Sequence, residues 1–201
     1  MQLRKGQNYL RCSVFGAFVL ALSSQSMYLA NETDLETGDR SEAMWAKKEK
    51  ASLNDPAPDF ELATASGRVV RLSDFRGKQP VVVYFYPKDE TRVCTAEACA
   101  FRDSYEDFKK EGAEVIGISS DPAESHRNFA KNHNLPFILL SDVGGKVRAA
   151  WGVPQTMGIL PGRVTYVIDK KGMIRLIFQS ATEAARHVDE ARKILAKLKA
   201  E

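Results

Sequence analysis

The sequence predicts an α/β fold with a mixed central β-sheet, helices on both faces of that sheet and a β-hairpin at its N-terminal end. Three observations support this fold class. Short, continuous apolar runs recur along the chain and are typical of strands buried on both faces. Segments with apolar residues three or four positions apart lie between them, as expected of amphipathic helices. Two strand–helix crossovers precede a closing hairpin, and this order indicates a mixed sheet.

The first half of the expected fold contains a hairpin, two buried strands and a helix. Thr64-Ala65-Ser66-Gly67 lies between two short apolar segments, which is a hairpin signal. The run from Val81 to Tyr86 is apolar and β-rich, and Pro87 ends it, so we expect a central strand there. From Thr95 to Lys110 the apolar residues are spaced as on one helix face. A second buried strand is expected over 115–119.

The second half contains two further helices, a short strand and a second hairpin. Asp121-Pro122 places proline in the first turn of a helix that runs toward Asn134. The last helix has one apolar stripe, which indicates packing against the core. In chain order we also expect a strand over 137–140, a helical turn or two over 144–151, a hairpin of 163–169 and 173–178, and a helix over about 182–199.

The first thirty residues have the composition of a targeting segment. They contain Arg4, Lys5 and Arg11 and no acidic residue. An apolar run over 12–22 follows, and then the small and polar Ser23-Ser24-Gln25-Ser26. This order of basic, apolar and small residues is that of a secretory signal peptide. The apolar run is too short for a comfortable membrane span, which needs about 20 residues.

We therefore expect residues 1–30 to be a cleaved signal peptide, with export to the periplasm or an equivalent lumen. The alternatives are an uncleaved membrane anchor that extends the apolar segment through Ala30, and a buried N-terminal helix. Residues 31–54 are expected to form a polar linker, because they carry mixed charge and few large apolar side chains. The folded domain is expected to span 55–201.

Composition and charge exclude several classes of function. The formal net charge is +3, from 29 basic and 26 acidic residues, and the three basic residues of the first thirty account for the excess. The neutral remainder is not expected to bind nucleic acid. Three cysteines are too few for a disulfide scaffold or a four-thiolate zinc site, so we expect no metal and no cofactor. His126 and His133 are expected to face solvent on one helix.

The residues that carry chemistry lie where the central strand meets its helix. A short loop follows Pro87, so Cys94 is expected at or near the helix N-terminus. Unpaired backbone N–H groups and the helix dipole favour an anion there, and the thiolate is the anion available. Thr91 can place a hydroxyl beside the sulfur. The alternative is an inert, buried thiol.

Cys99 follows Cys94 after five residues. On an intact helix the Cα atoms of such a pair lie roughly 8–9 Å apart, whereas a disulfide needs Cα atoms within about 7 Å. Either the two cysteines never pair, or the first turns of the helix unwind when they do. The spacing also argues against an oxidoreductase with a Cys-x-x-Cys motif.

Two blocks of the sequence resemble one family. Pro87-x3-Thr91-x2-Cys94 is the Pro-x-x-x-Thr-x-x-Cys signature of peroxiredoxins. The longer string from Tyr86 to Asp103, with its five-residue cysteine spacing, and the block over 160–169 are similar to the peroxiredoxin Q / bacterioferritin-comigratory-protein subfamily. The resemblance covers roughly residues 55–200. Arg92-Val93 departs from it, because the family usually has proline and often glycine there.

The resemblance implies a thioredoxin-like fold and the thiol-dependent reduction of hydrogen peroxide and organic hydroperoxides, with a role in antioxidant defence. It implies thioredoxin or a similar dithiol protein as the reductant, and a monomer. A thiol redox sensor and a disulfide-exchange protein are the alternative functions.

The resemblance also assigns roles to individual residues. Cys94 would be the peroxidatic nucleophile, and Cys99 the resolving thiol that forms an intramolecular Cys94–Cys99 disulfide. The remaining roles would be hydrogen bonding to the thiolate and peroxide by Thr91, shielding of the pocket from water by Pro87, stabilisation of the thiolate by Arg163, and orientation of Arg163 by Glu97.

Overall fold

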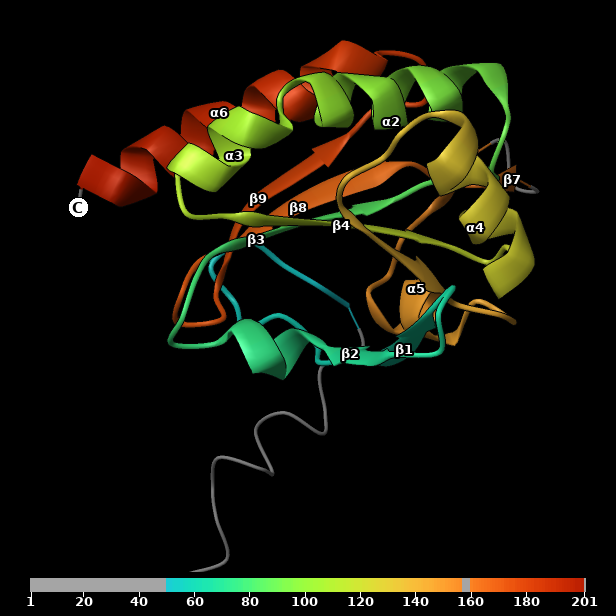
Figure 1. Cartoon of the computed structure of the whole chain (residues 1–201). Coiled ribbons are helices and arrows are strands. Elements are labelled where there is room, and N and C mark those ends of the chain that lie inside the picture. The colour runs from blue at the N-terminus through green and yellow to red at the C-terminus, as the bar shows by residue number, and fades with distance from the viewer. Residues whose placement is uncertain (1–49, 157–159, 201) are drawn as a thin grey trace, which may run out of the picture. The chain divides into compact units, whose positions relative to one another are not determined.

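The computed structural model describes residues 50–156 and 160–200, and these form the expected α/β fold (Figure 1). Seven strands make one mixed sheet in the order β2-β1-β5-β4-β3-β8-β9. The predicted targeting segment over 1–30 and most of the predicted linker over 31–54 lie outside the described residues. Within the described residues, no helix combines the length and the apolar content that a membrane span requires.

The bounds of the elements follow the predicted order closely. The sheet contains β1 (Glu61–Thr64), β2 (Val69–Arg71), β3 (Val81–Phe85), β4 (Glu114–Ser119), β5 (Ile138–Ser141), β8 (Val164–Ile168) and β9 (Ile174–Gln179). Two short strands, β6 (Gln155–Thr156) and β7 (Leu160–Pro161), pair separately. The helices are the 3-10 helix η1 (Leu72–Phe75), then α2 (Arg92–Asp103), α3 (Tyr105–Lys110), α4 (Ala123–Asn132), α5 (Lys146–Ala150) and α6 (Ala184–Ala200).

Strand β3 lies in the interior of the sheet, between β4 and β8, and is buried along its whole length. It pairs in parallel with β4 and antiparallel with β8. Because successive side chains of a strand point to opposite faces, Val82 and Tyr84 join one core cluster while Val83 and Phe85 join the other. The sheet therefore separates two apolar cores, and the predicted fold class is confirmed.

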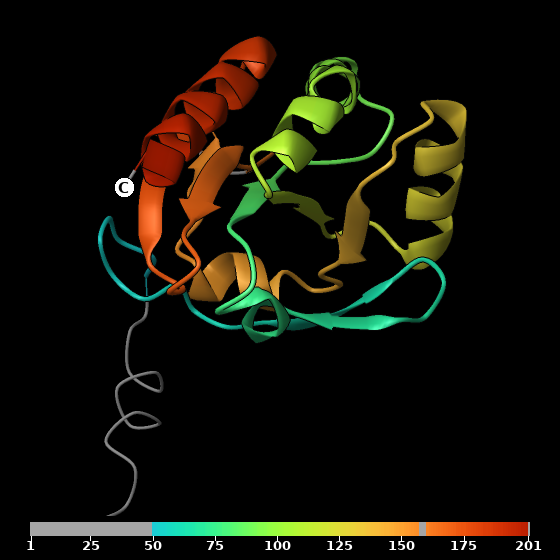
Figure 2. The same cartoon turned by 60° about the vertical axis from the view of Figure 1, so that its left-hand side comes forward.

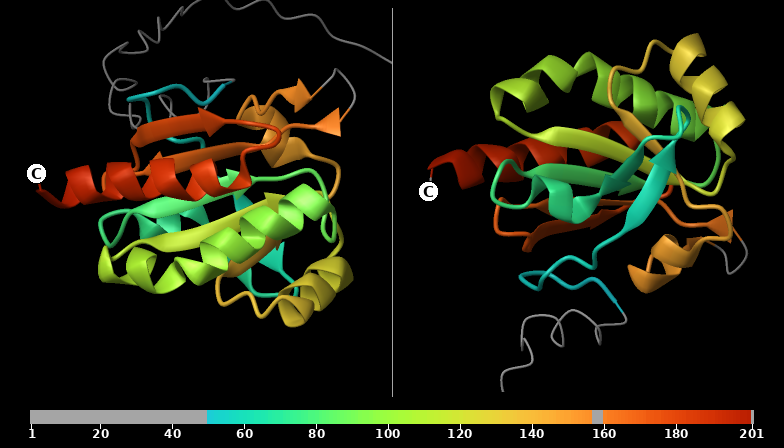
Figure 3. Two further views of the ribbon diagram at one scale, coloured as in Figure 1. Left: turned by 90° about the horizontal axis from the view of Figure 1, so that it is seen from above. Right: turned by 60° about the horizontal axis from the view of Figure 1, so that its bottom comes forward.

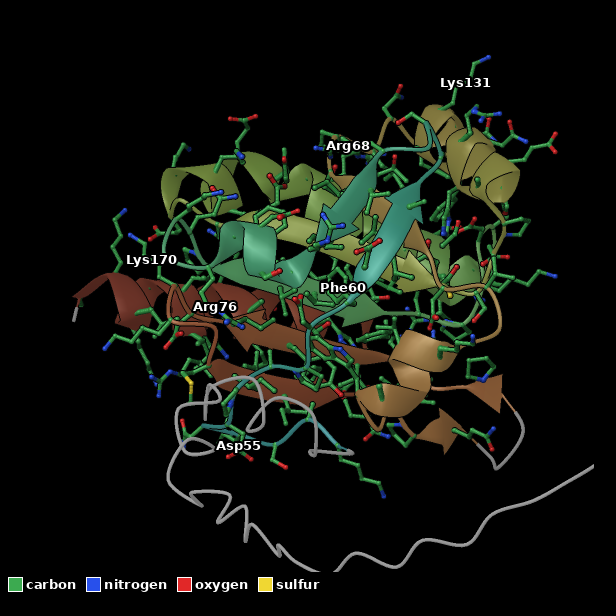
Figure 4. The ribbon with its side chains drawn as sticks, turned by 90° about the horizontal axis from the view of Figure 1, so that it is seen from below. Asp55, Phe60, Arg68, Arg76, Lys131 and Lys170 are labelled. Carbon is green, nitrogen blue, oxygen red and sulfur yellow. The ribbon has the colours of Figure 1, made fainter. Side chains whose placement is uncertain are left out.

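The two faces of the sheet carry different elements (Figure 2). Helices α2, α3, α4 and α6 cover one face, and α2 and α6 lie side by side there when seen from above (Figure 3). The other face carries α5 and the hairpin of β1 and β2. Figure 4 shows this second face from below, with Phe60 at the base of the hairpin and Arg68 at its tip.

Two predicted elements differ in the structure, and the short elements η1, β6 and β7 were not predicted. The helix expected over 95–110 begins at Arg92 and is divided at Ser104 into α2 and α3. Phe101 and Phe108, on either side of the division, are both fully buried, with their ring centroids 5.8 Å apart. The predicted hairpin is present, and its first strand also joins the main sheet, because β1 pairs antiparallel with β5.

Candidate active site around Cys94

Cys94 lies in the first turn of α2, close to the carboxyl end of β3. Thr91 caps this helix and Arg92 is its first residue. The first helical position needs no backbone hydrogen-bond donor, which is why proline is common there and why Arg92 can replace it without loss of a backbone bond. The Cys94 thiol is free and only 1% exposed. Its predicted place at the helix N-terminus is confirmed.

The guanidinium of Arg163 contacts the Cys94 sulfur. Arg163 Nη2 donates to Cys94 Sγ at 3.1 Å, and Arg163 is 3% exposed. The sheet explains the contact, because the register of β3 and β8 places Phe85 opposite Val164. Arg163 directly precedes that pair, so it lies beside the segment that leaves β3 and leads to Cys94.

Glu97 binds the other terminal nitrogen of the same guanidinium. It lies three residues after Cys94, on the same face of α2, and accepts a hydrogen bond at Oε2 from Arg163 Nη1. Burial raises the pKa of Glu97 to about 8, although the charge and hydrogen bond of Arg163 act in the opposite direction. Burial also opposes the charge on Arg163, but Glu97 and Cys94 together raise its pKa overall.

A second buried arginine, Arg148 of α5, supports this arrangement and was not identified from the sequence. Its Nη1 donates to the Gly162 carbonyl at 2.7 Å, and its Nη2 donates to the Tyr86 carbonyl at 2.5 Å. Burial lowers the pKa of Arg148, whereas Asp142 and Cys94 act to raise it. Arg148 thus ties the end of β3 to the residue before Arg163.

Gly162 is needed at its position because the backbone of Pro154 passes very close. A Cβ atom built on Gly162 would lie 2.0 Å from the Pro154 carbonyl oxygen, which no side chain can accommodate. Any larger residue would therefore displace the segment that carries Arg163.

Pro87 and Thr91 flank the loop between β3 and α2. Pro87 directly follows the buried Tyr86 and is itself half-buried. Thr91 is exposed, and its hydroxyl donates to the Lys88 carbonyl at 3.0 Å. A hydrogen bond from Thr91 to the sulfur therefore stays a prediction.

Asp89 anchors this loop to α4 through a buried polar network. Its carboxylate accepts hydrogen bonds from the Tyr86 hydroxyl and the Ser125 hydroxyl, both at 2.7 Å, and lies 2.9 Å from His126 Nδ1. Burial acts to raise the pKa of Asp89, but His126, Ser125 and Tyr86 lower it overall. The backbone N–H of Asp89 donates to Asp121 Oδ2 at 2.9 Å.

The prediction that His126 faces solvent is wrong, because its side chain is completely buried. Its Nε2 lies 3.1 Å from the Leu140 carbonyl, so both ring nitrogens face acceptors. His133, the next histidine along the chain, is partly exposed and pairs with Glu90 at 2.9 Å. Helix α4 and the residue that follows it therefore contact two successive loop residues. The contact with Asp89 is buried, and the contact with Glu90 is partly exposed to solvent.

Cys99 is half-buried and also carries a free thiol. It lies on the same unbroken helix as Cys94, so the helical spacing keeps the two residues too far apart for a disulfide. Within residues 50–156 and 160–200, no group of three His, Cys, Asp or Glu side chains is placed to hold a metal ion.

Comparison with known proteins points to one family. Residues 53–177 match the model of the AhpC/TSA family. Peroxiredoxin Q, chloroplastic, from Sedum lineare is 55% identical over 161 residues, which are 80% of this chain and 84% of that protein. The protein of the same name from Populus jackii is 49% identical over 185 residues, which are 90% of this chain and 86% of that protein.

A solved structure shows the same likeness in three dimensions. The crystal structure of peroxidoxin BcpB from Mycobacterium tuberculosis superposes with a TM-score of 0.68 at 36% sequence identity. The match covers 73% of this chain and 97% of that one.

The comparisons contradict the predicted export to a periplasm or lumen and the predicted membrane anchor. Both relatives are named as chloroplastic proteins. The prediction of a secretory signal peptide is therefore wrong. Its physical basis was weak, because a basic, acid-poor and serine-containing N-terminus is common to secretory signals and organelle transit peptides.

Proposed function

This chain belongs to the AhpC/TSA family and is a thiol-dependent peroxidase with the thioredoxin-like fold of peroxiredoxins, and we propose that Cys94 is its peroxidatic nucleophile. The contact between Arg163 Nη2 and Cys94 Sγ carries this proposal. A guanidinium is always charged and presents several donors in a fixed plane. It can therefore stabilise a thiolate and the negative charge that develops on a peroxide.

The first step oxidises Cys94 by two electrons. The Sγ–O bond forms as the O–O bond of the peroxide breaks, and the leaving oxygen departs as water or an alcohol after it takes up a proton. Cys94 becomes a sulfenic acid. The negative charge spreads over sulfur and both oxygens in the transition state, where each well-placed donor is worth roughly 3–4 kcal/mol.

Neighbouring residues support this step. Glu97 orients Arg163 by holding its second arm. Pro87 limits the access of water to the sulfur, and the Thr91 hydroxyl lies at the helix entrance, where it can turn from the Lys88 carbonyl to a bound peroxide. Arg148 and Asp89 fix the loop ends on which these residues lie.

Cys99 resolves the sulfenic acid in the second step. Its thiol attacks the sulfur of Cys94, a disulfide forms, and water leaves with the sulfenic oxygen. Because the two cysteines lie on one helix, the first turns of α2 must unwind before their Cα atoms come within about 7 Å. A dithiol protein of the thioredoxin type then reduces the disulfide by exchange.

The site residues named above all come from one chain, so a monomer suffices for this chemistry.

The compartment that fits the relatives is the plastid, and residues 1–30 then act as a transit peptide rather than a secretory signal. Import of the full chain into isolated plastids, with processing to a shorter form, tests this location; a chain that stays outside and unprocessed contradicts it.

The reaction is tested with one equivalent of hydrogen peroxide added to the fully reduced protein. The expected product has lost about 2 Da, with the linkage mapped to Cys94 and Cys99 after digestion. The Cys94→Ser variant must show neither the mass loss nor peroxide consumption. Peroxide consumption that persists in Cys94→Ser contradicts the assignment of the nucleophile.

A further inference from the structure

One buried oxygen of the proposed site has no hydrogen-bond partner in the described part of the chain. Glu97 Oε2 is bound to Arg163, but Glu97 Oε1 is unpartnered although the side chain is 0% exposed. His187 of α6 lies beside this oxygen, with its Nδ1 3.4 Å from Glu97 Oε1. An ionised carboxylate with a bare, buried oxygen is energetically costly.

The protonation of His187 follows from its own contacts. Its Nε2 lies 3.0 Å from the Ser180 carbonyl, which can only accept, so Nε2 carries the hydrogen. Burial lowers the pKa of His187 to about 4, so the ring is neutral at physiological pH. Nδ1 is then an acceptor and not a donor. It lies 2.8 Å from the Thr165 hydroxyl and faces Glu97 Oε1.

A carboxylate oxygen at this place would face another lone pair. A proton on Oε1 changes the contact from two acceptors into a donor and an acceptor, with the Nδ1 lone pair shared with the Thr165 hydroxyl. Resting on the function proposed above, we propose that Glu97 is a protonated carboxylic acid when the Cys94 thiolate reacts, and that His187 is the positioning residue that holds this proton on Oε1.

The charges around Glu97 support the same state. The groups around it are Arg163 beside β8, His187 of α6 and Tyr84 of β3, and Cys94 lies one turn earlier on its own helix. His187 and Tyr84 are neutral. If Glu97 is protonated, its buried carboxyl is neutral and the positive charge of Arg163 stabilises the Cys94 thiolate alone. If Glu97 is ionised, the same guanidinium must stabilise two anions, the carboxylate and the thiolate.

The proposal has a consequence for the reaction at alkaline pH. Burial places the pKa of Glu97 at about 8. Above that pH Glu97 loses its proton and competes with the thiolate for Arg163. The rate constant for peroxide reduction is therefore expected to fall as pH rises through the titration of Glu97.

Infrared spectroscopy of the reduced full-length protein tests the protonation directly. A protonated carboxyl has a C=O stretching band that a carboxylate lacks. The expected result is a buried-acid band at neutral pH that disappears with a midpoint near pH 8 and that is missing in Glu97→Gln. A wild-type protein that reduces peroxide but has no such band at neutral pH overturns the proposal.

Variants of His187 test its positioning role. His187→Leu removes the acceptor, so the band and the alkaline fall in rate must both shift to lower pH. His187→Asn restores an acceptor near the position of Nδ1, and must bring both midpoints back toward wild type. Shifts that are equal in the two variants, or absent from both, overturn the role of His187.

The same samples separate this inference from the function on which it rests. Failure of wild-type protein to consume peroxide rejects the proposed function. Consumption of peroxide by wild type without a titrating acid band rejects only the inference about Glu97 and His187.

Discussion

Arg163 and Cys94 are 69 positions apart in the chain, yet Arg163 Nη2 lies 3.1 Å from Cys94 Sγ. The antiparallel pairing of β3 with β8 produces this contact, because it aligns the carboxyl end of one strand with the amino end of the other. The pairing thus brings Arg163 beside the loop that leads from β3 to Cys94 at the start of α2. Such a site is held in place before substrate arrives, which is what electrostatic stabilisation of a transition state requires.

Replacement of Arg163 is expected to slow peroxide reduction strongly. Arg163→Met keeps an unbranched side chain but removes both the charge and the donors to Cys94 and Glu97. Loss of one such donor costs about 10²–10³ in rate, so the second-order rate constant measured by stopped-flow should fall by at least that factor.

A surface arginine provides the matched control for this experiment. Arg186 of α6 forms an exposed pair with Glu183, and Arg186→Met should leave the rate constant within about twofold, since exposed pairs contribute little. Equal decreases of the rate constant in Arg163→Met and Arg186→Met would show that the contact between Arg163 and Cys94 does not determine the rate of peroxide reduction.

Replacement of Cys99 is expected to stop the reaction after its first step. In Cys99→Ser the sulfenic acid on Cys94 has no resolving thiol, so a dimedone-type reagent should label Cys94 after one equivalent of peroxide. Steady-state turnover with a dithiol protein should fall by about tenfold or more. Unlabelled Cys94 together with full turnover would mean that Cys99 does not resolve the intermediate.

The sequence predicted the parts of the site that are local in the chain. Pro87, Thr91 and Cys94 lie on one strand end and one helix start, and their spacing determines their relative positions. Arg163 was assigned only through the resemblance of its block to a family, because a single arginine beside a strand has no distinctive pattern. Its contact depends on which strands pair, and local residue patterns do not determine that choice.

Arg148 and His126 show the same limit more clearly. Arg148 lies in a five-residue helix with no motif around it, and its burial depends on carbonyl groups of residues 86 and 162. His126 was expected on the solvent side, but Asp89 of a distant loop provides the partner that makes its burial possible. The strand order and the pairing of β1 with β5 likewise depend on contacts between distant segments.

The two acidic residues of the active-site loop should differ greatly in their effect on stability. Asp89 and Glu90 are adjacent, and they pair with His126 in the first turn of α4 and with His133 at its C-terminal end, respectively. Asp89 is buried, so Asp89→Asn leaves a buried network incomplete and should lower the free energy of unfolding by about 3–5 kcal/mol. Glu90→Gln should cost less than about 1 kcal/mol, because its pair with His133 is partly exposed.

Urea denaturation of both variants measures this difference, with equal slopes as the sign that the unfolded states are comparable. Amide hydrogen exchange should also quicken at the first turn of α2 in Asp89→Asn and stay near wild type in Glu90→Gln. Similar losses of stability in the two variants would contradict the anchoring role of Asp89.

His187 should make the folded state less stable in acid. Burial lowers the pKa of His187 to about 4 in the folded state, against an ordinary value of about 6.5. As pH falls below about 6.5, the unfolded chain takes up a proton that the folded chain does not. The free energy of unfolding therefore decreases by up to about 1.4 kcal/mol per pH unit until about pH 4. His187→Asn lacks this titration, so the stability that it loses relative to wild type at pH 7 should shrink steadily over the same window. Urea denaturation of the two proteins at matched pH values measures the difference, and a gap that stays constant from pH 7 to pH 4 would mean that His187 titrates normally in the folded protein.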